Sequence, residues 1–228
     1  MPGPASTKEA HVRKAGRPGT VGDAAIASVT VVALCSGGWL LGSGSPSHPP
    51  PQPSAAQAAS DPDREGSATS PLPPSPPVRI RIPAIRVDAP LTGLGLTDSG
   101  GLDAPPTEET NLAGWYEAGT KPGETGTAIV AGHVDNDRGP AVFYDLGALA
   151  KGSTVEVDRR DRSTAVFTVD AVEVYEAKSF PNDRVYGAAH RPELRVITCG
   201  GGYSKATGYQ GNVVVFAHLT AVRLPAAP

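Results

Sequence analysis

Proline is concentrated in one stretch of this chain, and that distribution limits where a folded domain can lie. Eleven of the 24 prolines fall between Pro46 and Pro77, where no apolar periodicity is present. A segment of this kind cannot bury enough apolar surface to offset the entropy of ordering it. Residues 43–77 are therefore predicted to form a disordered linker rich in Pro, Ser and Ala. Roughly 150 residues follow the linker, enough for one ordinary hydrophobic core.

Charge and cysteine content exclude two classes of protein. The 20 Lys and Arg against 23 Asp and Glu give a net charge of −3. This balance lacks the basic excess that is typical of nucleic-acid-binding domains, so no nucleic-acid partner is expected. The two cysteines, Cys35 and Cys199, are too few for a disulfide framework.

An uncharged stretch of 19 residues, 24–42, precedes the linker. As a helix it would span roughly 28 Å, about the thickness of the hydrocarbon core of a bilayer. Basic residues outnumber acidic ones in residues 1–23, whereas no Lys or Arg follows the stretch until Arg64. The positive-inside rule thus predicts a basic cytoplasmic tail at 1–23, a single transmembrane signal-anchor at 24–42 and an extracytoplasmic remainder.

Two other interpretations of the apolar stretch stay open. A cleaved signal peptide needs a small-x-small site close to the apolar end, and the nearest good candidate, at Ala56 and Ala58, is distant from it. A lipoprotein signal places its cysteine after the apolar run, whereas Cys35 lies inside it. We therefore favour an uncleaved anchor that holds an outer domain at the cell membrane, with Cys35 as a small apolar residue in lipid.

From Val78 onward the chain consists of short β-rich runs separated by Gly, Pro and Asp. Val78, Ile80 and Ile82 alternate with arginines, which is the period-two pattern of a half-buried strand. The only helical pattern covers 141–149, so the long crossover helices of a parallel α/β fold are missing. About eight short strands predict an all-β barrel or sandwich. The other strands are expected at 85–91, 127–131, 154–157, 165–174, 194–198, 212–217 and 219–224.

Cys199 is the first candidate for chemistry. It ends the apolar run LRVIT and is followed by three glycines, which let substrate and backbone approach closely. It is the only cysteine of the predicted outer domain, and a reduced thiol in an oxidising compartment is expected to be either deeply buried or functional. A thiol with the ordinary pKa of about 8.5 is only about 3% thiolate at pH 7, so a nucleophilic cysteine needs a nearby base, usually histidine.

His133 is the best-placed histidine to act as that base. It follows the apolar run TAIVA and Gly132 and then opens an irregular polar stretch, much as Cys199 follows its own apolar run. If the two runs are neighbouring strands, His133 and Cys199 meet at one edge of the sheet. A structural loop histidine is the alternative. The remaining histidines precede the domain, lie in a polar loop or continue a strand (His11, His48, His190, His218).

A metal site at the same place is a weaker interpretation. His133, Asp135 and Asp137 alternate along the chain, and an extended segment would present them on one side to a Ca²⁺ ion. No partner cluster occurs elsewhere, so solvated turn residues are favoured for the two aspartates. The chain also lacks a zinc motif and a glycine-rich phosphate loop. We therefore predict no metal and no cofactor.

The residues around both candidates resemble a known family. TAIVAGHVD around His133, VITCGG around Cys199 and the following NVVVFA are similar to the catalytic core of sortases, the membrane-anchored cysteine transpeptidases of Gram-positive bacteria. The order of His and Cys, 66 residues apart, and the early IRIPAIRVDAPL also match. The resemblance covers about Val78 to Leu224. The TCGG form is most similar to actinobacterial class F sortases, with class E as the neighbour.

This resemblance implies an eight-stranded sortase-type β-barrel with short helices over 78–224, followed by a tail at 225–228. It implies that Cys199 attacks an LPxTG-like sorting signal of a surface protein between Thr and Gly and forms a thioester. His133 would protonate the leaving amine. An amine acceptor, such as a cell-wall precursor, would then resolve the acyl-enzyme, and water would give hydrolysis instead.

One departure from the family concerns the arginine that sortases carry on the strand after the cysteine. No Arg lies between Cys199 and Val215. We assign the matching position to Gln210, whose amide can donate a hydrogen bond to an oxyanion but carries no charge. Lys205 and Arg195 are the alternatives for this role.

Two other functions stay open. The missing arginine argues for a sortase-like barrel that binds surface peptides without catalysis. Another cell-wall cysteine hydrolase or transpeptidase is the second alternative. Papain-like peptidases, however, usually place the Cys before the His, and L,D-transpeptidases keep the two in one short motif. A sortase-type transpeptidase at the outer face of the cell membrane is the expected function.

Overall fold

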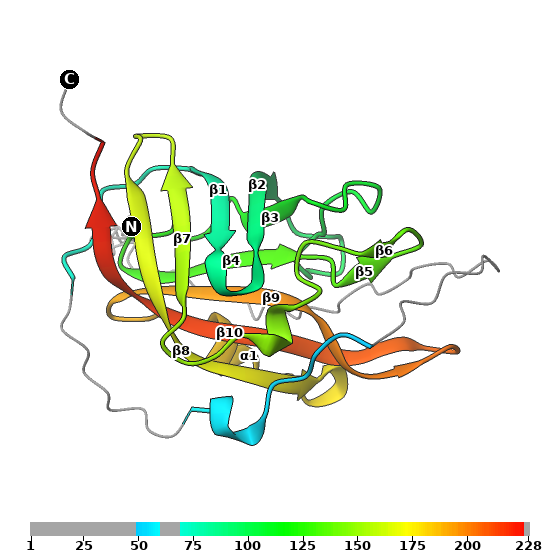
Figure 1. Ribbon diagram of the computed structural model, residues 1–228. Coiled ribbons are helices and arrows are strands. Elements are labelled where there is room, and N and C mark those ends of the chain that lie inside the picture. Colours follow the sequence, from blue (N-terminus) through cyan, green and yellow to red (C-terminus); the bar gives the residue numbers. More distant parts are fainter. Residues whose placement is uncertain (1–48, 60–68, 226–228) are drawn as a thin grey trace, which may run out of the picture.

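Eight strands close into a barrel in the computed structural model, which describes residues 49–59 and 69–225 (Figure 1). Around the barrel the strands follow the order β1-β2-β3-β4-β9-β10-β8-β7. The all-β, eight-stranded barrel expected from the sequence is therefore confirmed. In chain order these strands are β1 (Pro77–Ile82), β2 (Val87–Leu94), β3 (Ala113–Tyr116), β4 (Gly126–Gly132), β7 (Thr154–Arg159), β8 (Thr164–Glu176), β9 (Pro192–Ser204) and β10 (Gly208–Arg223).

Short elements connect the barrel strands. A two-stranded hairpin, β5 (Asp135–Asn136) and β6 (Gly139–Pro140), follows β4. The single α-helix of the described residues, α1 (Asn182–Tyr186), lies between β8 and β9. The four 3-10 turns are η1 (Ala55–Gln57), η2 (Pro83–Ile85), η3 (Leu146–Ala148) and η4 (Ala177–Ser179).

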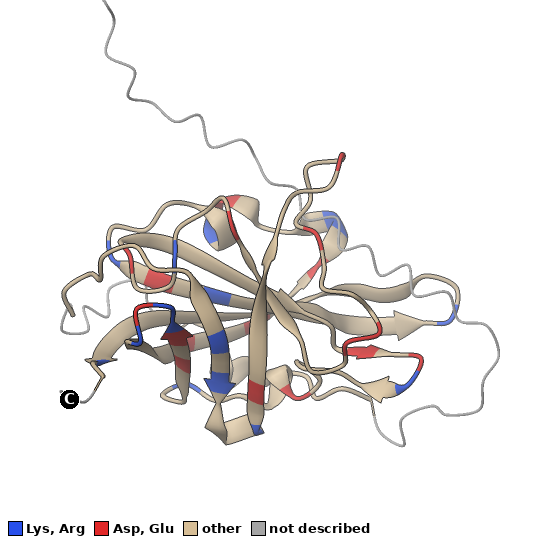
Figure 2. Cartoon of the chain, turned by 90° about the horizontal axis from the view of Figure 1, so that it is seen from above, with Lys and Arg blue, Asp and Glu red and all other residues tan. Residues whose placement is uncertain are grey.

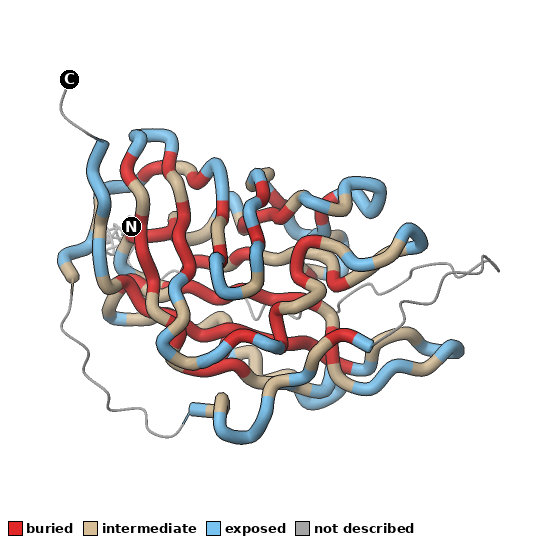
Figure 3. The backbone as a smooth tube through the Cα atoms, viewed as in Figure 1, coloured by how far each residue is buried: buried red, intermediate tan, exposed pale blue. Residues whose placement is uncertain are grey.

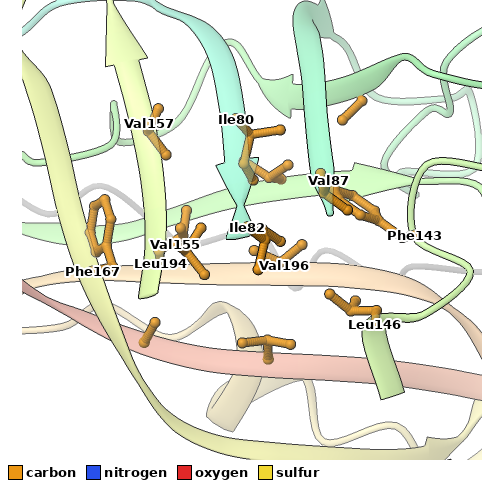
Figure 4. Close-up of a cluster of buried hydrophobic side chains, with 14 of the residues drawn as sticks. Ile80, Ile82, Val87, Phe143, Leu146, Val155, Val157, Phe167, Leu194 and Val196 are labelled. Carbon is orange, nitrogen blue, oxygen red and sulfur yellow. The ribbon is translucent and has the colours of Figure 1, made fainter. Parts of the chain in front are cut away.

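The core fills the barrel interior with aliphatic side chains from alternate strand positions (Figure 4). Ile80 and Ile82 of β1 are fully buried, and their alternating arginines point outward. Each fully buried aliphatic side chain of this size stabilises the folded state by about 1.5–3 kcal/mol relative to an exposed one. Figure 3 shows the resulting pattern, with buried residues along the strands and exposed residues in the turns. Further fully buried members of the core are Phe143, Leu146, Val155, Val157, Phe167, Leu194 and Val196.

The outer face of β9 and β10 is also apolar, because a second cluster covers it. Val185 of α1 is fully buried against Ile197 of β9 and Val214 and Phe216 of β10. Burial on both faces explains why these two strands are continuous apolar runs in the sequence and do not alternate. The Thr127 hydroxyl on β4 donates a hydrogen bond to the carbonyl of Gly187 at 2.7 Å, which ties the end of α1 to the sheet.

Three elements differ from the sequence-based expectation. β3 was not expected, because its four residues are too few to show a period. The runs at 212–217 and 219–224 form one continuous strand, β10, that pairs with β8 through two register shifts. The expected helix at 141–149 is wrong beyond the single turn η3, since Val142 and Phe143 enter the core in irregular backbone.

Part of the predicted linker contacts the barrel. Leu72 packs against the core, and its backbone N–H donates to the carbonyl of Gly123 at 2.8 Å. Ser75 is 5% exposed, and the carbonyl of Pro73 accepts a hydrogen bond from the buried guanidinium of Arg159. The stretch 69–77 thus contacts the barrel through backbone and side-chain groups, whereas a disordered linker was expected for 43–77.

Residues 49–59 also contact the barrel. The side chain of Gln52 accepts a hydrogen bond from the Gly201 N–H at 3.1 Å, and that of Gln57 accepts one from the Lys151 N–H at 2.8 Å. Among the described residues, no helix has both the length and the apolar character needed to cross a bilayer. The predicted tail at 1–23 and the transmembrane segment at 24–42 lie outside the described residues.

Charged residues of both signs are interspersed over the described part of the chain (Figure 2). Arg81 of β1 forms ion pairs with Glu156 and Asp158 of β7, and Arg223 of β10 reaches the same Glu156 at 2.8 Å. The bond to Arg223 is the largest cause of a lowered pKa for Glu156, and it acts against the desolvation that raises that pKa. These pairs join β1 to its neighbour β7, and β7 to β10 across β8, on the outside of the barrel.

Candidate active site

Two parallel strands bring the candidate base and nucleophile to one end of the sheet. β4 pairs with β9 in parallel from Gly126 opposite Pro192 to Ala131 opposite Ile197. Every pair in this register joins residues 66 positions apart, which is also the separation of His133 from Cys199. The two residues therefore lie at the same level: His133 directly follows β4, whereas Cys199 lies within β9, which continues to Ser204. The expectation that their apolar runs are neighbouring strands is confirmed.

A side-chain hydrogen bond fixes this end of the two strands. The Thr198 hydroxyl donates to the carbonyl of Gly132 at 2.8 Å. Thr198 directly precedes Cys199, and Gly132 directly precedes His133. The bond thus links the two backbone positions that carry the candidate residues.

His133 and Cys199 line one pocket on the outer face of the barrel, and both are half-buried. Its walls come from the ends of β4 and β9, from β10, from α1 and from the connection between β2 and β3. Most of the lining is apolar or small, which suits an extended peptide better than a highly charged ligand. The other lining residues are Thr97, Leu102, Asp103, Ala104, Pro105, Ala131, Gly132, Tyr186, Ile197, Thr198 and Asn212.

The connection between β2 and β3 orients the imidazole of His133. The Nε2 atom lies 2.7 Å from the carbonyl oxygen of Pro105. A carbonyl can only accept a hydrogen bond, so Nε2 carries the proton and donates. In a neutral imidazole the other nitrogen, Nδ1, is then the proton acceptor. The buried Pro105 thereby selects the tautomer of the candidate base.

A second contact holds the loop that follows His133. The Tyr209 hydroxyl on β10 donates to Asp135 Oδ2 at 2.5 Å, across 74 residues of sequence. Burial raises the pKa of Asp135, opposed by the hydrogen bond from Tyr209 and by the charge of His133. Burial and the same hydrogen bond raise the pKa of Tyr209. Tyr209 is therefore a neutral donor that stabilises the Asp135 carboxylate.

The structure does not bring Gln210 to the pocket. Gln210 is exposed, at a register shift between Tyr209 and Gly211 in the pairing of β10 with β9. The family resemblance, from which Gln210 was assigned, does not reveal this shift in register. The position directly opposite Cys199 is occupied by Asn212.

The alternative cations also lie elsewhere. Arg195 is buried, with its guanidinium 2.7 Å from Glu193 and 4.6 Å from the centre of the Phe216 ring. Lys205 is exposed in the turn between β9 and β10. Within the described residues, no Lys or Arg lines the pocket.

Sequence reasoning missed two pocket residues, Asn212 and Tyr186. Asn212 opens the run NVVVFA and is 3% exposed. Pairing that run with RVITC as a β-hairpin would have placed it beside the cysteine. Tyr186 ends α1, where its ring stacks on Phe180 at 5.7 Å between ring centres. No local pattern marks Tyr186, because a five-residue helix has no visible period.

The weaker metal interpretation gains no support from the geometry. Asp137 is exposed and Asp135 is engaged by Tyr209. No group of three or more His, Cys, Asp or Glu side chains in the described ranges is arranged to hold a metal ion. The chemistry that the pocket residues support is that of a thiol and an imidazole, which together permit nucleophilic attack with proton transfer.

Comparisons with known proteins agree with this arrangement. Residues 80–220 match the model of the family described as Sortase domain. No curated protein matches the chain. Sortase C-1 from Actinomyces oris is 20% identical, with a TM-score of 0.50 over 63% of this chain and 73% of its own. At that identity the likeness shows the fold alone.

Two other solved structures are similar at slightly lower scores. Sortase A from Listeria monocytogenes is 17% identical, with a TM-score of 0.49 over 65% of this chain and 90% of its own. Sortase E1 from Streptomyces coelicolor, solved with a tripeptide in the active site, is 14% identical, with a TM-score of 0.49 over 68% of this chain and 93% of its own.

Proposed function

The chain belongs to the sortase family, and on that premise we propose that it is a cysteine transpeptidase that cleaves an LPxTG-like sorting signal with Cys199 as nucleophile and His133 as acid and base. One observation carries the assignment of these residues. His133 directly follows β4 and Cys199 lies at the same level within the adjacent parallel strand β9, and both line the same pocket. A nucleophile and a base on neighbouring rigid strands meet the basic requirement of covalent catalysis.

The proposed reaction has two halves. The sulfur of Cys199 attacks the carbonyl carbon of the substrate threonine, and the bond from that carbon to the glycine nitrogen breaks. His133 takes the proton of the Cys199 thiol and gives it to the departing glycine amine, which leaves a thioester. An amine acceptor then attacks the thioester carbonyl and loses a proton to His133. A new amide forms and the thiol is regenerated. Water in place of the amine would give hydrolysis.

The partners and location follow from the proposed chemistry and from the sequence. We propose surface proteins with C-terminal sorting signals as substrates and a cell-wall precursor as one amine acceptor. The uncharged stretch at 24–42 and the basic residues before it support a single-pass membrane anchor with an extracytoplasmic catalytic domain. Class F, with class E as the neighbour, stays a prediction from the TCGG motif.

Turnover of a fluorogenic LPxTG-type peptide in the presence of an amine tests this proposal. The full chain is compared with Cys199→Ala and His133→Ala, each checked for folding by circular dichroism. Turnover by the parent and loss of at least about a hundredfold in both variants supports the enzyme. Equal turnover by the parent and Cys199→Ala would remove Cys199 as the nucleophile.

A barrel that binds sorting signals without cleaving them is the second candidate function. The observation that favours it is the pocket lining, which within the described residues contains no Lys or Arg to stabilise an oxyanion. Saturable peptide binding by the parent, with neither cleavage nor a covalent adduct, would support this alternative over the transpeptidase.

A further inference from the structure

Two buried polar atoms in the pocket have no hydrogen-bond partner among the described residues: Oδ1 of Asn212 and the hydroxyl of Tyr186. Buried polar groups in native proteins are nearly always paired, and each exception needs an explanation. Both residues line the pocket that holds Cys199 and His133. A ligand that fills this pocket can supply the missing partners.

Asn212 has the more constrained position. It lies directly opposite Cys199 in the register of β10 with β9, and its side chain is almost completely removed from solvent. The amide nitrogen of Asn212 is directed at the carbonyl of Thr198, at 3.4 Å. The amide oxygen is thereby left as an acceptor that requires an N–H donor.

Tyr186 offers the complementary group. Burial raises the pKa of its hydroxyl, which therefore stays protonated and can donate a hydrogen bond. The backbone at this end of α1 is held by the hydrogen bond from Thr127 to the carbonyl of Gly187. An acceptor and a donor on two rigid elements match the N–H and C=O groups of an extended peptide backbone.

We propose that Asn212 Oδ1 accepts a backbone N–H of the bound sorting signal and that the Tyr186 hydroxyl donates to one of its backbone carbonyls. The inference rests on the proposed function, since the peptide is the substrate of that reaction. The contact is neutral and holds main-chain atoms next to the scissile bond. Among the described residues, no Lys or Arg lines this pocket. Asn212 and Tyr186 are then peptide-binding residues that determine where the threonine carbonyl lies relative to Cys199.

Replacing single backbone amides of the substrate by esters tests the contact with Asn212. An ester removes one N–H and leaves the side chains unchanged. In an LPxTG-type peptide the proline has no N–H, so esters are placed at the variable residue and at the threonine, one at a time. The scissile bond stays an amide. Turnover of each peptide by the full chain is then measured as kcat/KM.

The parent is expected to lose about tenfold in kcat/KM with one of the two esters, the factor expected for one good hydrogen bond. With the amide peptide, Asn212→Ala is expected to have a kcat/KM about tenfold below that of the parent. Replacing the amide by that ester should not lower the kcat/KM of Asn212→Ala any further. Asn111→Ala, an exposed amide outside the pocket, should behave as the parent does. An ester penalty that is the same in the parent and in Asn212→Ala overturns the contact.

Two further variants separate binding from folding. Asn212→Thr keeps an oxygen acceptor on a β-branched residue that suits a strand, and it should recover part of the ester sensitivity that Asn212→Ala loses. Tyr186→Phe should raise KM several-fold, whereas Tyr116→Phe, on β3 outside the pocket, should not. An unchanged KM in a folded Tyr186→Phe variant overturns the tyrosine contact. Failure of the parent to turn over any peptide removes the proposed function, and this inference with it, before any variant is compared.

Discussion

Tyr209 donates a hydrogen bond to Asp135 and so joins the strand that follows Cys199 to the loop that follows His133. The two residues are 74 positions apart in the sequence, yet each lies close to one member of the candidate pair. This contact and the hydrogen bond from Thr198 to Gly132 hold the ends of β4, β9 and β10 together. We infer that the alignment of the His133 imidazole with the Cys199 thiol depends on both hydrogen bonds.

Tyr209→Phe is expected to lower kcat by about tenfold, the equivalent of one lost hydrogen bond to a charged group. The phenyl ring should keep its contact with Tyr203, whose ring centre lies 5.1 Å away, so the hairpin should remain folded. Tyr203→Phe serves as the matched control. Steady-state kinetics with both variants checks the expectation, and an unchanged kcat in folded Tyr209→Phe would contradict it.

Gln210→Ala is expected to retain activity to within about twofold, because the side chain is exposed and does not line the pocket. The variant should also unfold at the same temperature as the parent. A loss of a hundredfold or more, the typical effect of removing an oxyanion donor, would return Gln210 to the role that the sequence comparison suggested.

Glu156→Gln is expected to destabilise the barrel at neutral pH and to have little effect in acid. Ion pairs with Arg223 and Arg81 lower the pKa of Glu156 below its ordinary value of 4.5. Its carboxylate therefore contributes stability that is complete above about pH 4.5 and is lost as the pH falls through the lowered, folded-state pKa. Urea unfolding at pH 7 should show a loss of about 1–3 kcal/mol.

The control for this comparison is Glu109→Gln, which removes an exposed carboxylate away from these pairs. It should leave the free energy of unfolding unchanged at both pH values. A Glu156→Gln variant that is equally destabilised at pH 7 and well below pH 4 would mean that packing, and not charge, is the lost contribution.

A chain that begins at residue 78 is expected to be less stable than one that begins at residue 69. The shorter chain lacks the Pro73 carbonyl that binds the buried guanidinium of Arg159, and it lacks the Ser75 hydroxyl that accepts from the Asp161 N–H at 3.1 Å. Leaving a buried charged group partly unpaired costs about 2 kcal/mol, equivalent to a fall in Tm of roughly 5 °C. Equal Tm values for the two chains would show that these contacts contribute nothing.

Local sequence patterns were sufficient to predict an all-β domain of about eight strands and to select the candidate pair, and the family resemblance implied the barrel. The runs TAIVA and LRVIT are largely apolar, and both faces of β4 and β9 are covered. A reactive residue directly after such a run can be recognised from the sequence alone. The helix at 141–149 was mispredicted because its apolar residues fill the barrel interior in irregular backbone. Tertiary packing, and not helical period, sets their spacing.

Features that depend on register or on distant contacts could not be predicted in this way. The position of Asn212 opposite Cys199, with Gln210 outside the pocket, depends on the irregular pairing of β10 near Tyr209. The segment before β1 is held to the barrel in part by Arg159. This residue binds the carbonyl of Pro73, which lies 86 residues away in the sequence. Composition alone describes that segment as a linker, because its contacts are made with residues distant in the sequence, and several of them use backbone atoms.

The most direct test of the account is the intact mass of the full chain after incubation with an LPxTG-type peptide in the absence of an amine acceptor. The parent should gain the mass of the peptide fragment that ends at threonine, and hydroxylamine should remove that mass, as expected for a thioester. Cys199→Ala should gain nothing, and His133→Ala should gain the adduct far more slowly. Cleavage of the peptide by a parent that never carries an adduct, or an adduct that persists in Cys199→Ala, would contradict the proposed mechanism.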